Sequence, residues 1–170
     1  MTLDIITHFY RYHEWATDRL LASLEQLTPE EYTAPGCSGN GSIRDTLAHM
    51  LSVHSGWFSW FDGAMSVAEA MKPSVTGEDI PTVAEARERW APIAQQTDAF
   101  IGSLTEERAN AKVSWAVPNG PSGQTELWKM MLQTANHGTH TRAQIVAAIR
   151  RAGHNPGTFE LLGFIMSNPE

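Results

Sequence analysis

Hydrophobic positions recur every three or four residues in four long stretches of the chain, which is the spacing of an amphipathic helix. The first two stretches cover residues 2–27 and 42–61, and the second is apolar nearly all round. The third covers residues 82–104 and contains Pro92, at which we expect a kink. The fourth covers residues 125–152. The pattern therefore predicts four helices of similar length, with the second in a central position.

Polar residues mark where two of these helices should begin. Ser42 is followed three residues later by Asp45, and Thr82 is followed three residues later by Glu85. Both pairs fit a capping box, in which each side chain accepts a hydrogen bond from the other residue's backbone. Gly153 follows the last periodic residues and is expected to end the fourth helix.

The segments between the long helices carry turn residues and short patterns of their own. We expect one helical turn near residues 67–71, a small hairpin at residues 113–123 and a short apolar helix at residues 159–166. The link at residues 62–81 is long enough to support a non-sequential up–down order of the helices. We therefore predict an all-α four-helix bundle with long crossover connections and a short C-terminal helix, forming one domain over residues 1–170.

Composition excludes several classes of function. The 170 residues carry a formal net charge of −7, which argues against a nucleic-acid partner because such proteins present basic surfaces. No apolar run approaches the roughly 18 residues of a membrane span, and the N-terminal stretch lacks the features of a signal peptide. Cys37 is the single cysteine, so no internal disulfide is possible. We expect a cytoplasmic protein with no membrane partner.

Three histidines form the strongest candidate for chemistry. His137 and His140 are three residues apart in the fourth helix and project from the same side of it, while His49 lies in the middle of the second helix. Two imidazoles from one helix and a third from a facing helix can hold a divalent metal ion and leave positions open. Taken alone, His49 also fits a core or rim histidine with a single hydrogen bond.

Other reactive side chains are assigned lesser roles. His54 is about 140° around the helix from His49, so the two cannot easily share a metal ion. Cys37 is interpreted as a spectator thiol, and Trp57 and Trp60 are candidates for the mouth of a pocket near His49. The remaining histidines are expected to be structural: His8, His13 and His154.

Four motifs, in this order, give the chain a family resemblance. They are His13-Glu14-Trp15-Ala16, residues 42–49 (SIRDTLAH), residues 136–144 (NHGTHTRAQ) and residues 153–157 (GHNPG). With them the chain resembles the DinB/YfiT-like family of metal-binding four-helix bundles. The resemblance implies a divalent metal ion, nickel or zinc, held by one histidine of the second helix and two of the last. His49 and His137 match the ligand positions. The usual third position holds Thr141, and His140 is the candidate substitute.

The resemblance implies two kinds of function. The first is a metal-dependent enzyme, either an S-transferase that uses a low-molecular-weight thiol such as bacillithiol or mycothiol, or a hydrolase of a small molecule. The second is a non-catalytic, stress-associated bundle with a degenerate metal site, acting as a binding or dimerisation module, which Thr141 favours. Arg142 either steers an anionic thiol or pairs with an acid of the first helix, Glu14 or Asp18, and we favour the pairing.

The first helix also bears on assembly. It carries more aromatic residues than one bundle core is expected to hide: Phe9, Tyr10, Tyr12 and Trp15. An exposed apolar stripe on this helix would favour a symmetric homodimer.

Overall fold

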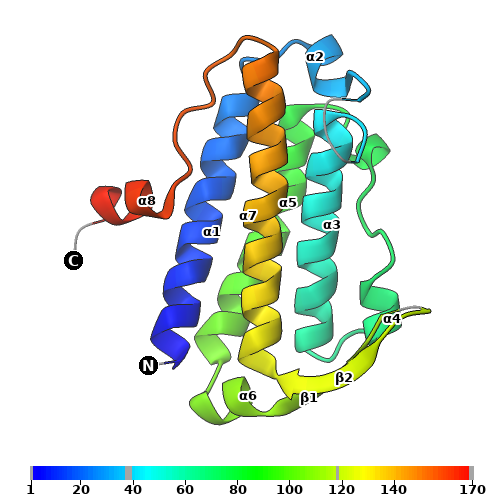
Figure 1. Ribbon diagram of the computed structural model, residues 1–170, viewed down its shortest axis with the longest axis vertical. Coiled ribbons are helices and arrows are strands. Elements are labelled where there is room, and N and C mark those ends of the chain that lie inside the picture. The colour runs from blue at the N-terminus through cyan, green and yellow to red at the C-terminus, as the bar shows by residue number, and fades with distance from the viewer. Residues whose placement is uncertain (1, 37–39, 118, 169–170) are drawn as a thin grey trace.

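Four long helices lie side by side as a bundle in the computed structural model (Figure 1). Helices α1 (Thr2–Leu24) and α7 (Leu127–Arg151) run in one direction, and α3 (Ile43–Phe61) and α5 (Val83–Ser103) run in the other. Helix α7 packs against both α1 and α3, and α5 packs against the same two helices. The chain reaches α5 through a connection that returns along the length of the bundle, so α3 and α5 are parallel. The predicted four-helix, all-α architecture with a long crossover is confirmed.

The structure describes residues 2–36, 40–117 and 119–168. Cys37 lies outside these residues. The shorter elements are α2 (Pro29–Thr33), α4 (Val67–Ala70), the 3₁₀ turn η1 (Gly77–Asp79), α6 (Glu106–Asn110), β1 (Lys112–Ala116), β2 (Ser122–Glu126) and α8 (Leu161–Ser167). Strands β1 and β2 form the predicted antiparallel hairpin, in which Ser114 lies opposite Gln124. In the described part of the chain, no helix is both long and apolar enough to cross a membrane.

The helix boundaries follow the caps. The Ser42–Asp45 and Thr82–Glu85 capping boxes both form, as predicted. Helix α5 continues through Pro92. The first helix ends at Leu24, three residues earlier than expected, and α7 begins two residues later than expected because strand β2 continues to Glu126.

Helix α6 was not predicted from the sequence. It is five residues long and begins after Thr105, whose hydroxyl accepts a hydrogen bond from the backbone N–H of Arg108. The third residue of this helix is Arg108, whereas a capping box has an acidic or amide side chain at that position. Without that signal, a helix this short has too few residues to show a period.

The apolar core consists of two clusters with a polar layer between them. One cluster fills the end of the bundle where α1 finishes and includes Leu20, Leu51 and Ile149. The other fills the opposite end and includes Tyr10 and Phe58. On each long helix, buried polar residues lie between the positions that belong to the two clusters: His13 and Thr17 on α1, His54 on α3, Thr97 on α5, and Thr141 and Arg142 on α7.

Helix α8 covers much of the aromatic surface of α1. Phe164 of α8 packs with Tyr12 in a third apolar cluster, and Phe9 and Trp15 lie against that cluster. The Tyr12 hydroxyl donates a hydrogen bond to the carbonyl oxygen of Phe159 (2.8 Å), which ties the C-terminal segment to α1. The aromatic residues expected to be surplus to the bundle core therefore have a partner within the chain.

Candidate metal centre

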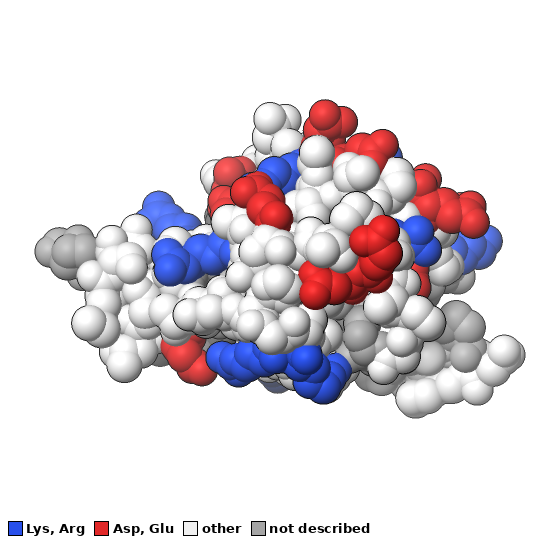
Figure 2. All heavy atoms as spheres, turned by 90° about the horizontal axis from the view of Figure 1, so that it is seen from above, with Lys and Arg blue, Asp and Glu red and all other residues white. Residues whose placement is uncertain are grey.

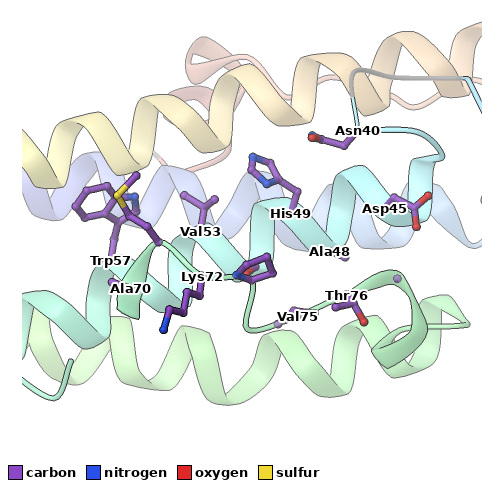
Figure 3. A pocket seen from close by; sticks show the side chains of 14 residues that line it. Asn40, Asp45, Ala48, His49, Val53, Trp57, Ala70, Lys72, Val75 and Thr76 are labelled. Atoms are coloured by element: carbon purple, nitrogen blue, oxygen red, sulfur yellow. The ribbon is translucent and has the colours of Figure 1, made fainter. Parts of the chain in front are cut away.

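His49 and His137 meet where α3 packs against α7. Their ring centroids are 5.1 Å apart and the rings are nearly perpendicular, at 73°. Both side chains are half-buried, and Figure 3 shows His49 extending from α3 toward α7. The two helices run antiparallel, so residues 49 and 137 lie at the same level of the bundle although they are far apart in sequence. The predicted convergence of these two histidines is confirmed.

Both imidazoles are held in the neutral form. Burial lowers the pKa of His49, and burial together with the nearby His49 and His140 lowers the pKa of His137. A neutral imidazole has a free lone pair on one ring nitrogen, and this is the form that binds a metal ion. The chemistry of the two side chains therefore fits a site for nickel or zinc, with two protein ligands.

Thr141 stands where the family resemblance implies a third ligand. It is 1% exposed, and its hydroxyl donates a hydrogen bond to the carbonyl oxygen of His137 (2.9 Å). Its Oγ1 also lies 3.4 Å from Nε2 of His137. Because the hydroxyl hydrogen is directed to the carbonyl, Oγ1 faces the imidazole as an acceptor and favours a proton on Nε2. Thr141 thus orients His137.

His140 does not join the pair. Its side chain is exposed, and the Gln144 amide nitrogen donates a hydrogen bond to its Nε2 (2.8 Å). Among the residues that the structure describes, no three His, Cys, Asp or Glu side chains gather closely enough to share a metal ion. The structure therefore brings together His49 and His137 and leaves His140 on the surface of α7.

A pocket of about 400 Å³ opens beside His49. It lies between α3, α4 and the segment that leads to η1, and Trp57 lines it as expected (Figure 3). Trp60 instead packs edge-on against Trp57, with ring centroids 5.3 Å apart. Helix α4 closes one side of this pocket. It can pack closely against α3 because Gly56 has no side chain at the point where the backbone of Ala70 approaches. His49 thus borders a space that can admit a small molecule.

A second group of buried histidines lies behind this pair. His13 and His54 are 1% and 3% exposed, and their rings stack with centroids 4.7 Å apart. Arg142 donates a hydrogen bond to Nδ1 of His13 (3.0 Å), and because arginine only donates, the His13 proton lies on Nε2. That Nε2 has no hydrogen-bond partner among the described residues. His13 is structural, as predicted, but it lies deep in the core.

Arg142 was expected to pair with an acid of the first helix, and this was wrong. It contacts α1 through His13 and through the Thr17 hydroxyl (3.4 Å), and it donates to the Thr139 hydroxyl on its own helix (3.1 Å). The sequence contained one sign of this packing, which is Gly138 in the middle of a helix. A Cβ at residue 138 would overlap the ring of His13.

Burial controls the charge of these two histidines as well. It lowers the pKa of His54 to about 3, with a further contribution from the Arg142 charge. Burial, Arg142 and His54 hold the pKa of His13 well below its usual value. Both rings are therefore neutral near pH 7, and the hydrogen bond between Nε2 of His54 and Thr97 (2.8 Å) anchors the pair to α5.

Comparison with known proteins identifies the family of this chain. The family model described as "DinB family" matches residues 1–170. The protein named "Protein DinB" from Bacillus subtilis (strain 168) is 25% identical over 156 residues, covering 89% of this chain and 88% of the relative. Because the family model matches over this whole length, the chain belongs to the DinB family.

Proposed function

We propose that this DinB-family protein binds a divalent metal ion, nickel or zinc, through His49 and His137, and acts on a small molecule held in the adjoining pocket. The observation that carries the proposal is the 5.1 Å approach of two neutral imidazoles from different helices. Two protein ligands leave more coordination positions open than three do, so we propose that the bound small molecule supplies a further donor.

A low-molecular-weight thiol is the donor that we propose. A divalent ion at this position would lower the pKa of a bound thiol or water and so favour an attacking nucleophile. The protein's own residues would position the reactants. Thr141 fixes the orientation of His137, while Trp57 and Val53 offer apolar contacts and Lys72 brings a cation to the pocket. Transfer of the thiol to an electrophile and hydrolysis of a small molecule are the two reaction classes proposed.

A second candidate function is a non-catalytic binding or dimerisation module with a degenerate metal site. Two observations favour it: Thr141 fills the third ligand position, and His140 lies outside the pair. In this case His49 and His137 would serve as hydrogen-bonding groups at the pocket wall. The two candidates differ in whether the unmodified protein binds a metal ion.

Titration of protein without a histidine tag with Zn²⁺ and Ni²⁺, followed by calorimetry, tests the proposal. We expect one ion per chain, with binding lost in His49→Ala and in His137→Ala. His154→Ala is the matched control because it removes a histidine whose Nε2 contacts Glu31 (3.0 Å) at a different place. Binding that survives both pocket substitutions, or no binding at all in the unmodified protein, would reject the two-histidine metal site and leave the binding module.

A further inference from the structure

Arg142 is a buried cation without a counter-charge. Its side chain is 2% exposed, and it donates hydrogen bonds to His13, Thr17 and Thr139, which are neutral groups. Its guanidinium also lies over the ring of Tyr12, 5.5 Å from the centroid. In the described part of the chain, no Asp or Glu lies within ion-pair distance of Arg142.

Such an arrangement is energetically costly. A charged group taken out of water loses its hydration, and neutral hydrogen-bond partners restore only part of that loss. Buried arginines in proteins are therefore usually paired with a carboxylate or a bound anion. A guanidinium has five N–H donors. The hydrogen bonds to His13, Thr17 and Thr139, together with the contact to the Tyr12 hydroxyl, leave donor capacity for one more partner.

A second pocket provides a place for that partner. Its volume is about 350 Å³, and it lies between α1, α7 and the segment that leads into α8. Arg142, Tyr12 and Thr139 line it together with Arg150 and Glu160. It shares no lining residue with the pocket beside His49.

The electrostatic surroundings of this pocket favour an anion. Arg150 is exposed and lies eight residues after Arg142, so it is roughly 12 Å further along α7. The neighbouring Arg151 adds a positive charge to the last turn of the same helix. Viewed from this end of the bundle, Figure 2 shows one group of Lys and Arg side chains along the lower edge, with an acidic side chain close to it and other basic side chains at the left, top and right. Glu160 is the one acidic residue that lines the pocket.

We propose that the pocket between α1, α7 and the segment before α8 binds the oxyanion group of a small molecule, a carboxylate or a phosphate, against Arg142. Arg150 attracts the ligand at the mouth of the pocket, and Glu160 opposes it. The Tyr12 hydroxyl donates to the carbonyl oxygen of Phe159 and so holds the wall that carries Glu160. This site is independent of the metal ion proposed at His49 and His137.

Nuclear magnetic resonance titration tests this site with two probes, inorganic phosphate and acetate, at constant ionic strength. We expect saturable shifts of the Arg142 side-chain N–H signal and of the backbone amides near Glu160. Saturation by either probe supports the proposal, and the tighter probe identifies the class of oxyanion. Saturation by neither probe, or shifts confined to the pocket beside His49, would overturn it.

A second test substitutes exposed charged residues, because replacing the buried Arg142 would also disturb folding. Arg150→Gln should weaken probe binding by about threefold to fivefold, since an exposed charge contributes at this scale. Glu160→Gln should strengthen binding, because it removes the opposing charge. Arg151→Gln, which makes the same charge change outside the pocket lining, is the matched control and should have the smaller effect. Equal effects of Arg150→Gln and Arg151→Gln would overturn the assignment, and His49→Ala should leave anion binding unchanged.

Discussion

The hydroxyl of Thr141 donates a hydrogen bond to the carbonyl oxygen of His137 (2.9 Å), and its oxygen lies 3.4 Å from the Nε2 of the same residue. Thr141 is fully buried, so this contact is fixed by the packing of α7 against its neighbours. A residue at this position that carried an imidazole would lie beside His137 on the same face of the helix. The relationship defines which substitution should change metal binding most.

Thr141→His should create a site with three protein ligands. A histidine four residues after His137 faces the same side as that residue, and His49 approaches from α3. We expect zinc affinity to increase at least about tenfold over the unmodified protein, which corresponds to about 1.4 kcal/mol of binding free energy. Calorimetric titration measures it. The double variant with His49→Ala is the control, and the prediction is contradicted if that variant keeps the gain.

His140→Ala should leave metal binding unchanged. His140 is exposed and is engaged with Gln144, so its removal takes nothing from the His49–His137 pair. The same titration with zinc measures the effect. Loss of binding in this variant would show that His140 rotates into the site when a metal ion binds, and the site would then be the three-histidine centre that the sequence pattern suggests.

The order of helices and their caps could be predicted from the sequence because those signals are local. Ser42 and Asp45 are three residues apart, and their capping box depends on nothing else in the chain. Helix periodicity likewise depends on neighbouring turns of the same helix. The meeting of His49 with His137 was proposed from the need for a third ligand on a facing helix, and the resemblance to a known motif order supported it. Spacing within one helix cannot show which residue of another helix lies opposite.

The buried polar layer could not be predicted for the same reason. Whether His13 is a surface residue or a core residue depends on Arg142, which is 129 positions away, and on the stacking of His54. The i, i+3 spacing of His137 and His140 suggested a shared ligand face. The helix rotation instead turns His140 to solvent and places Thr141 inside. Successive residues of a helix are about 100° apart around its axis, and this one step decides whether position 140 or position 141 faces the core.

Gly138→Ala should destabilise the protein, although alanine is the better helix former. An added Cβ would overlap the ring of His13, which cannot retreat because Arg142 and His54 hold it. We expect a loss of about 1–3 kcal/mol in the free energy of unfolding, the usual cost of overpacking. Urea denaturation measures it. Gly102→Ala is the matched control: it lies in α5 with open space around the new Cβ and should be neutral or stabilising by up to about 1 kcal/mol.

We propose a homodimer that uses the outer face of α8. This helix covers the aromatic residues of α1 but leaves Leu162 and Met166, four residues apart, 65% and 74% exposed. Light scattering at micromolar concentration should give twice the chain mass, and Leu162→Glu with Met166→Glu should convert the protein to a monomer. Met65→Glu changes an exposed methionine elsewhere and serves as the control. A monomeric unmodified protein would reject the dimer.

Two kinds of ionisable group, the buried histidines and the half-buried Glu14, should make the free energy of unfolding depend on pH in opposite ways between about pH 6.5 and 4.5. The folded-state pKa of His54 is about 3, below its ordinary value, so the unfolded chain binds the proton first as the pH falls. His13 acts in the same sense. The contribution of the two rings to the free energy of unfolding is complete above about pH 6.5. It decreases on acidification by up to about 1.4 kcal/mol per pH unit for each ring. Glu14 acts in the opposite sense: burial, and then the nearby Asp98 and Asp18, raise its pKa to about 7.

Glu14→Gln should therefore make the acid destabilisation steeper. In the unmodified protein the folded state takes up a proton on Glu14 as the pH falls below 7, and this uptake stabilises it down to the unfolded pKa near 4.5. Glutamine removes that compensation and leaves the loss that comes from His13 and His54. Because Glu14 is only half-buried, solvent screens its charge. The difference in stability between Glu14→Gln and the unmodified protein should therefore be smaller than the pKa of Glu14 alone implies. Urea denaturation at about pH 7.0, 5.5 and 4.5, the range between the folded and unfolded pKa values of Glu14, measures the slopes. Asp4→Asn, in the first turn of α1, is the control. Equal slopes for Glu14→Gln and the unmodified protein would contradict the prediction.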